Sequence, residues 1–247
     1  MVGDYPNNLK LLLPSNVLEK TKRKNLNILD LCCGPGIAGI HIHNELERLG
    51  FGVDKVTFVD INKSRLKAIP NNPKYSVHMH DVLEYREDHN FDIATLRCAI
   101  YYFNTQNQYK LLRNLHGLLN HQGILIITSL GRDDSQAGFF TNLHRTILDM
   151  KQIKYDGYYM SPETLKTKLT NVGIKPFDTL TFGNTRWNSN SLGDKYGLSK
   201  NQKVTLAEWL CAQSKSDELA CLNFKITPKH VDFDMPLFNL FGTKTES

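Results

Sequence analysis

Short apolar runs alternate along the first half of the chain with segments in which apolar residues recur every three or four positions. Continuous runs favour buried β-strands, because a strand covered on both faces carries apolar side chains on both. We predict such strands at residues 26–31, 56–60, 91–96 and 123–130, and a further strand at residues 75–79. The periodic segments between them predict helices at residues 36–49, 63–69 and 105–119. This alternation predicts an α/β fold with a mostly parallel sheet and helices on both faces.

The alternation ends after Leu130, where helical and polar segments follow one another. Residues 184–203 are polar and favour a loop, and Thr205 with Glu208 forms a capping-box pattern that predicts a helix start. Pro236 interrupts the last apolar segment, which predicts an edge strand or a bulge there. Two more helices and two more strands are expected at 133–154, 161–173, 177–182 and 233–241. We therefore expect one domain, residues 1–247, with insertions.

Composition narrows the class of protein. No apolar run approaches the roughly 20 residues of a membrane span, and the N-terminus lacks a signal-peptide pattern. The net charge of +5 is mild, and its main basic cluster, residues 20–24, is typical of a solvated surface. Five cysteines without a Cys-x-x-Cys pair favour a reducing compartment. We expect a cytoplasmic protein with no metal site and no nucleic-acid or membrane partner, and the choice between monomer and homodimer stays open.

A glycine-rich turn, Gly34-Pro35-Gly36, links the first predicted strand to the first helix. Glycines let the backbone approach a ligand, and the helix start offers unpaired N–H groups to it. Gly34 to Gly39 matches the G-x-G-x-x-G pattern of dinucleotide-binding enzymes, with Asp60 placed to bind a ribose. Tyr196 and Lys200 also have a spacing found in some short-chain reductases. An NAD(P)-binding oxidoreductase is therefore one interpretation.

The segment Asp30-Leu31-Cys32-Cys33-Gly34-Pro35-Gly36 resembles the first motif of class I S-adenosylmethionine-dependent methyltransferases. Cys32 replaces the first glycine of that motif, so its side chain must point away from the ligand. Asp60 matches the acid that binds the ribose hydroxyls in this family. Asp81 and Val82 match the positions that contact the adenine.

Residues 91–103 resemble the fourth-strand motif of the ubiquinone/menaquinone-biosynthesis-like subgroup (methyltransferase type 11/25), in which many relatives carry two histidines where Tyr101 and Tyr102 stand. The resemblance covers the chain from about residue 25 onward. It implies a Rossmann-like, doubly wound, seven-stranded sheet with helical lid insertions, and S-adenosylmethionine as cofactor with S-adenosylhomocysteine as product. The cofactor-binding residues that it implies are Asp30, Cys32, Cys33, Gly34, Pro35, Gly36, Asp60, Ile61, Asp81, Val82 and Arg97.

The acceptor side is predicted from the segments outside the cofactor sheet. These are an N-terminal lid at residues 1–24 and substrate-side insertions at 132–160 and 184–225, and their aromatic content suits a small, partly apolar or aromatic molecule. Tyr101 and Tyr102 are the candidate catalytic residues, with a role in positioning rather than proton abstraction. Tyr5, Tyr158, Tyr159 and Trp187 are the candidate substrate-binding residues.

Other functions remain open at this stage. A protein or RNA methyltransferase is one alternative, and a non-catalytic cofactor-binding protein is another. The chain has no Asn/Asp-Pro-Pro-Tyr tetrapeptide after the fourth strand, which in related families marks methylation of planar amino nitrogens in DNA bases or glutamine. We therefore discount those two substrates.

Overall fold

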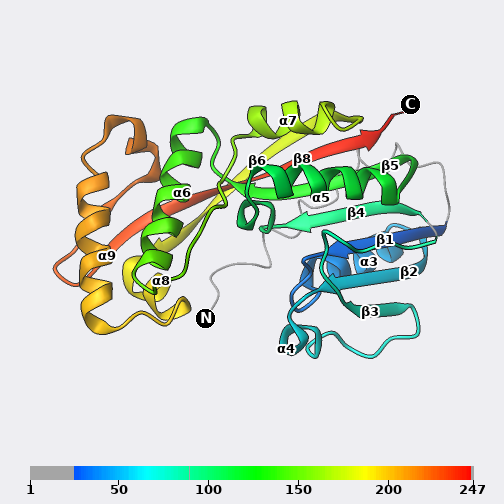
Figure 1. Ribbon diagram of the computed structural model, residues 1–247, viewed down its shortest axis with the longest axis horizontal. Coiled ribbons are helices and arrows are strands. Elements are labelled where there is room, and N and C mark those ends of the chain that lie inside the picture. Colours follow the sequence, from blue (N-terminus) through cyan, green and yellow to red (C-terminus); the bar gives the residue numbers. More distant parts are fainter. Residues whose placement is uncertain (1–24, 89, 246–247) are drawn as a thin grey trace.

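The computed structural model describes residues 25–88 and 90–245, so Tyr5 and the predicted N-terminal lid, 1–24, lie outside the described residues. One sheet runs through the molecule (Figure 1). Its strands are β1 (Asn25–Leu31), β2 (Gly52–Asp60), β3 (Tyr75–Met79), β4 (Phe91–Arg97), β5 (Leu119–Leu130), β6 (Ile174–Asn188), β7 (Lys225–Ile226) and β8 (Val231–Lys244).

The strand order is β3-β2-β1-β4-β5-β8-β6, and the two-residue β7 pairs with β8. Strands β1 to β5 are parallel, whereas β8 runs antiparallel to both β5 and β6. The expected mostly parallel sheet is confirmed, although it contains eight strands rather than seven. The order reverses between β1 and β4, and the crevice outside the carboxyl ends at such a reversal is where open α/β sheets bind ligands.

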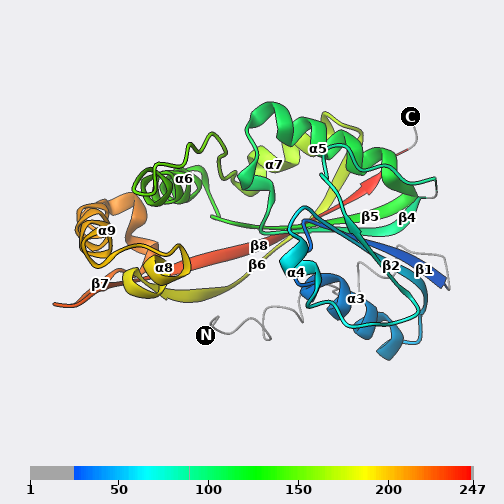
Figure 2. The ribbon, with the colours of Figure 1, turned by 60° about the horizontal axis from the view of Figure 1, so that its bottom comes forward.

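Helices cover both faces of the sheet, as predicted, with α5 and α7 on one side and α3 and α4 on the other (Figure 2). Each face has its own apolar core, because the strands alternate side chains between the two faces. The helices are α3 (Ile37–Arg48), α4 (Lys63–Leu66), α5 (Thr105–Leu118), α6 (Asp134–Asp149), α7 (Pro162–Thr170), α8 (Ser189–Lys195) and α9 (Lys200–Gln213), with 3-10 turns η1 (Ile100–Tyr102) and η2 (Asp217–Leu222).

A second lobe is built on the far ends of β6 and β8, which extend beyond the parallel strands (Figure 1). It contains α6, α8, α9 and η2, and it has a third apolar core that includes Phe140, Leu206 and Phe233. The second lobe stands opposite the carboxyl ends of the parallel strands. The second lobe therefore faces the crevice between β1 and β4, where the strand order reverses.

The predicted loop at 184–203 is wrong, because this segment contains the end of β6, all of α8 and the start of α9. Its polar composition resembles a loop, but Asn188 caps α8 by accepting a hydrogen bond from the Ser191 N–H group. The predicted helix start at Thr205 is also wrong. Helix α9 begins earlier, where Ser199 and Gln202 form the capping box.

Strand β8 lies inside the sheet between β5 and β6, but Pro236 lies in a part of β8 that pairs with β6 alone, which agrees with the predicted edge position. A proline is tolerated there for two reasons. The β5 ladder ends at the pair Leu130–Leu237, so Pro236 lies beyond it. On the other side, a register shift in β6 between Phe182 and Asn184 faces Pro236, as the alternative prediction of a bulge requires.

Helix α3 packs against the sheet through Gly39, and this contact yields a stability prediction. A Cβ at position 39 would lie 2.6 Å from Phe58 Cε1 and 3.1 Å from Asp30 Cβ. We expect Gly39→Ala to lower the free energy of unfolding by about 1–3 kcal/mol, because the helix must move away from the sheet. Gly138→Ala in α6 is the control, since a Cβ there meets nothing within 4 Å. It is expected to raise the free energy of unfolding by up to about 1 kcal/mol. Equal urea midpoints for the two variants would contradict the prediction.

Candidate functional site

The glycine turn between β1 and α3 is built from residues in the left-handed region of backbone space. Cys32, Gly34 and Gly36 have φ values of +53°, +54° and +77°. The turn is closed by a hydrogen bond from the Gly36 N–H group to the Cys33 carbonyl. Gly36 is also the N-cap residue of α3. It has no side chain that could accept a hydrogen bond from the first N–H groups of the helix. The first N–H groups of α3 therefore face the carboxyl edge of the sheet.

Cys32 adopts a backbone conformation that a non-glycine residue rarely takes. Its side chain packs against the apolar core that lies between the sheet and α5. Burial raises the pKa of the Cys32 thiol, and the carboxylates of Asp60, Asp30 and Asp81 raise it further. Three carboxylates from the ends of β1, β2 and β3 therefore surround the turn.

Asp30 is buried at the end of β1 beneath the turn. Its Oδ2 accepts a 2.9 Å hydrogen bond from the Gly39 N–H group, but its Oδ1 has no partner among the described residues. Burial raises the pKa of this carboxyl to about 7, although the Gly39 hydrogen bond and the Arg97 guanidinium lower it. An unsatisfied carboxylate oxygen in a buried position is costly, and it marks a place where a hydrogen-bond donor is missing.

Asp60 lies at the end of β2, where its carboxylate holds the turn in place. Its Oδ2 accepts from the Gly34 N–H group and its Oδ1 from the Asn62 N–H group, each at 2.8 Å. A carboxylate has about four lone-pair sites, so two remain for further donors. Ile61, the next residue, is 71% exposed, which leaves an apolar side chain on the surface beside this carboxylate.

Asp81 and Val82 follow β3. Asp81 is exposed, and its Oδ1 accepts a 2.9 Å hydrogen bond from the Leu83 N–H group. Val82 is buried in the core beneath α5. The remaining turn residues are the buried Cys33, whose N–H group donates to the Val59 carbonyl, and the half-buried Pro35.

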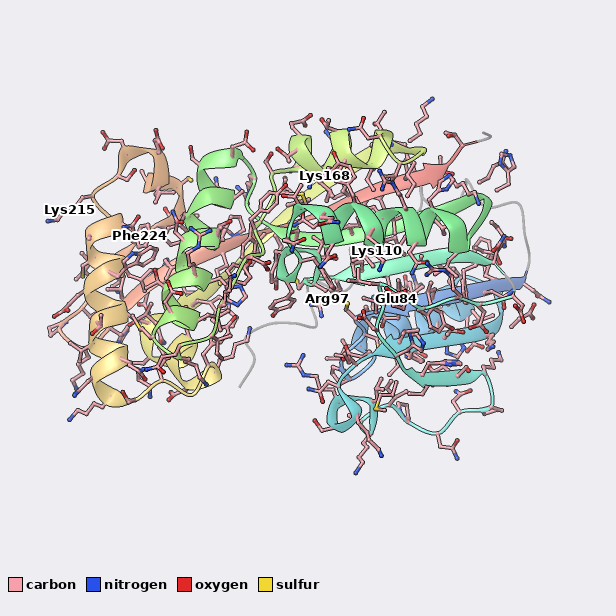
Figure 3. All side chains as sticks on the ribbon, viewed as in Figure 1. Glu84, Arg97, Lys110, Lys168, Lys215 and Phe224 are labelled. Carbon is pink, nitrogen blue, oxygen red and sulfur yellow. The ribbon has the colours of Figure 1, made fainter. Side chains whose placement is uncertain are left out.

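The end of β4 separates the glycine turn from a large pocket. Arg97 lines this pocket and also lies near Asp30, whose pKa it lowers. In Figure 3 Arg97 lies at the end of β4 that faces the second lobe. Cys98, the next residue, has a φ of +50° and lines the same pocket. The backbone therefore turns sharply between the crevice and the pocket.

The pocket lies between the sheet and the second lobe and contains about 730 Å³ of empty space, including its open mouth. Its walls come from the end of β4, from α6 and α8, and from β6 and β8. Most of the lining side chains are aromatic or aliphatic, among them Tyr101, Phe140, Leu143, Ile147, Tyr159, Trp187, Leu192, Tyr196, Met235 and Leu237. The Tyr101 and Tyr159 rings stack with centroids 4.0 Å apart. The lining is typical of a site for an apolar, planar ligand.

His144 of α6 lines the pocket and is buried. Its Nε2 lies 3.3 Å from the Tyr196 hydroxyl, and its Nδ1 has no hydrogen-bond partner among the described residues. Burial, and then the ammonium of Lys195, lower the pKa of His144 to about 4. The imidazole is therefore neutral near pH 7 and has a free nitrogen.

The structure separates the predicted acceptor residues into two groups. Tyr101, Tyr159 and Trp187 line the pocket. Tyr102 is 50% exposed and does not line it, and Tyr158 packs beside α5, with the Lys168 ammonium 5.1 Å from its ring centroid. Lys195 was missed by the sequence analysis, and Tyr196 was considered only for its reductase-like spacing, because their segment was expected to be a loop. The Leu192, Lys195 and Tyr196 spacing is the helical signal that marks one face of α8.

The reductase interpretation requires Tyr196 and Lys200 to share a site. Tyr196 follows α8 and lines the pocket, whereas Lys200 begins α9 and lines a separate groove on the second lobe.

Within residues 25–88 and 90–245, no group of three His, Cys, Asp or Glu residues is placed to hold a metal ion. No helix in that part of the chain is long and apolar enough to cross a membrane.

Comparisons with known proteins agree with this geometry. A family model described as "Methyltransferase domain" matches residues 5–176 of the chain. No curated protein matches the sequence significantly. Solved structures match well despite low sequence identity, so these matches report the fold alone.

A putative methyltransferase from Bacillus halodurans has a TM-score of 0.74 at 16% identity, covering 94% of this chain and 98% of that one. The YcgJ protein of Bacillus subtilis has a TM-score of 0.76 at 15% identity, covering 98% and 99%. The N-methyltransferase NodS of Bradyrhizobium japonicum, solved with S-adenosylhomocysteine, has a TM-score of 0.54 at 12% identity, covering 99% and 91%. Since the family model spans more than half of the chain, the protein belongs to the methyltransferase domain family.

Proposed function

We propose that the protein is an S-adenosylmethionine-dependent methyltransferase that methylates a small, partly apolar or aromatic molecule at oxygen, nitrogen or carbon. The observation that carries this proposal is the position of the glycine turn. It lies among three strand-end carboxylates and next to an aromatic pocket. A reaction between a cofactor and a small acceptor requires two adjoining sites of this kind. The five free cysteines suit a reducing compartment, and we place the protein in the cytoplasm.

The residues of the crevice fit this cofactor. The buried Asp30 Oδ1 has no partner, and the cofactor's methionine part carries N–H donors. Asp60 retains free lone pairs for the two ribose hydroxyls, and the exposed Ile61 offers an apolar surface for the adenine. Asp81 and Val82 follow the neighbouring strand, where the adenine amino group would find an acceptor. Arg97 supplies a cation for the methionine carboxylate.

When bound, S-adenosylmethionine supplies a methyl group on a positively charged sulfur and leaves as S-adenosylhomocysteine. The pocket residues orient the acceptor and exclude water from it. Positioning of this kind contributes a large part of a rate enhancement. The Tyr101 hydroxyl stays protonated, since burial raises its pKa well above the ordinary value, and it acts as a hydrogen-bond donor. The insertions at 132–160 and 184–225 provide most of the pocket walls.

Of the two tyrosines, Tyr101 has the position that suits a role in acceptor binding. We expect Tyr101→Phe to lower kcat/KM by about tenfold, because one hydrogen bond in a buried pocket is lost. Tyr102→Phe should have a smaller effect, about two- to threefold on kcat/KM, since the half-exposed Tyr102 does not line the pocket and contributes only through its hydrogen bond with Tyr101. Steady-state kinetics with the acceptor found by a labelled-cofactor metabolite screen measures both values. Unchanged kinetics for both variants would exclude the positioning role.

Calorimetry with S-adenosylhomocysteine and NADH, each titrated into the purified protein, tests the proposed function. We expect S-adenosylhomocysteine to bind with micromolar affinity and NADH not to bind. Binding of NADH alone would overturn the proposal. Binding of S-adenosylhomocysteine without methyl transfer to any compound in the metabolite screen would instead indicate a non-catalytic cofactor-binding protein.

A further inference from the structure

Among the residues that the structure describes, the charged side chains that line the aromatic pocket are all cationic. They are Arg97 and Lys195, and no described lining residue is an aspartate or glutamate. A cation beside an apolar, partly enclosed space is stabilised by an anion that enters that space. Such a pocket favours a ligand that brings a negative charge with it.

Lys195 has no carboxylate partner in the part of the chain that the structure describes. Its ammonium lies 4.8 Å from the Trp187 ring centroid and 5.6 Å from the Tyr196 ring centroid. Contacts with ring faces attract a cation but leave its N–H donors unused. Lys195 stands at the mouth of the pocket, where solvent still reaches it. An anion entering the pocket therefore meets these donors without breaking an existing ion pair.

His144, from α6, adds a second polar group to the lining of the pocket. If the Tyr196 hydroxyl donates to Nε2, the imidazole proton resides on Nδ1, the nitrogen without a partner. That N–H group is then a donor in the wall that Lys195 also lines. The two side chains come from different helices, α6 and α8. His144 lies next to the stacked rings of Tyr101 and Tyr159, and Lys195 lies over the rings of Trp187 and Tyr196. An aromatic slot with donors along one wall matches an aromatic acid.

We infer that the acceptor of this enzyme is an aromatic or similarly planar carboxylic acid whose carboxylate is bound by Lys195. The inference rests on the proposed function and specifies its substrate class. Arg97 is left for the cofactor, because it lies near Asp30 at the glycine turn. Lys195 is then the residue that selects acids over neutral molecules of the same shape, and His144 donates a supporting hydrogen bond.

The test compares carboxylates with their amides, which have the same shape and no charge. The probes are phenylacetate, indole-3-acetate and naphthalene-1-carboxylate, each paired with its amide and titrated into protein saturated with S-adenosylhomocysteine. We expect at least one acid to bind about tenfold more tightly than its amide, as a charge-assisted hydrogen bond provides. Lys195→Met should remove this preference, and Lys195→Arg should retain most of it.

Lys215→Met is the matched control, because Lys215 lies on the outer side of the second lobe, away from the pocket (Figure 3). It should keep the preference of the unmodified protein. Thermal melting verifies that each variant is folded. The inference is overturned if no acid binds more tightly than its amide, including the case in which no probe binds. It is also overturned if Lys195→Met weakens S-adenosylhomocysteine binding as much as acid binding, because Lys195 would then serve the cofactor. Failure of S-adenosylhomocysteine to bind the unmodified protein would count against the proposed function instead.

Discussion

Asp60→Ala is expected to weaken S-adenosylhomocysteine binding by about 10²- to 10⁴-fold. The estimate follows from two hydroxyl hydrogen bonds to a charged acceptor, each of which contributes about 1.5–3 kcal/mol. The same carboxylate also holds the Gly34 and Asn62 N–H groups, so its loss loosens the turn that approaches the ligand. Both effects act in the same direction on affinity. Calorimetry on the purified variant measures the change.

Asp54→Ala is the control for this experiment, because Asp54 is an exposed residue near the other end of the same strand. It removes a carboxylate of the same type without touching the crevice, and its affinity should equal that of the unmodified protein. Thermal melting separates lost binding from lost folding. If folded Asp60→Ala protein bound S-adenosylhomocysteine within threefold of the unmodified protein, the ribose-binding role would be wrong.

Asp30→Asn is expected to stabilise the unliganded protein increasingly as the pH rises from 5 to 8. Burial raises the pKa of Asp30 to about 7 from an ordinary value of 3.8. The folded protein therefore holds the proton more strongly than the unfolded chain does. The stability that this proton provides is fully present below the pKa that the Asp30 carboxyl has in the unfolded chain. It is lost as the pH rises through the pKa that this carboxyl has in the folded protein. A shift of this size corresponds to on the order of 4 kcal/mol.

Asparagine keeps an acceptor for the Gly39 N–H group and carries no charge, so the variant avoids this loss. Urea denaturation of both proteins at pH 5 and pH 8 gives the difference in free energy of unfolding at each pH. The difference should grow by about 2–3 kcal/mol over this range, because most of the titration between the two pKa values falls within it. It should stay constant for Asp54→Asn, which removes an exposed carboxylate. A difference that did not change with pH would show that Asp30 is not protonated in the folded protein at pH 5.

Strands β1, β2, β4 and β5 could be predicted from the sequence because a parallel strand buried on both faces is a mostly apolar run. The edge strand β3 was predicted as well, although none of its residues is buried. The ends of these strands could be predicted as well. Since parallel strands place their carboxyl ends along one edge, Asp30, Asp60 and Asp81 had to meet there. The local motif therefore located the crevice without knowledge of the rest of the fold.

The second lobe could not be predicted in the same way. The end of β6 is polar, and what makes it a strand is its pairing with β8, about fifty residues away. The capping box at Ser199 has the same local pattern as the one expected at Thr205, so the sequence alone does not choose between them. Lys195 and His144 meet only because α6 and α8 pack on this shared ladder. Their position is a property of the tertiary fold.

The ladder between β6 and β8 determines which motions can admit an acceptor. It runs from Ile174 to Asn188, so the second lobe and the central sheet share one pair of strands (Figure 1). A wide hinge opening would break ladder hydrogen bonds and is therefore costly. The ladder is interrupted near Pro236, where β5 has ended and the register shifts. Bending at this register shift would therefore disturb fewer ladder hydrogen bonds than a wide hinge between the second lobe and the parallel sheet.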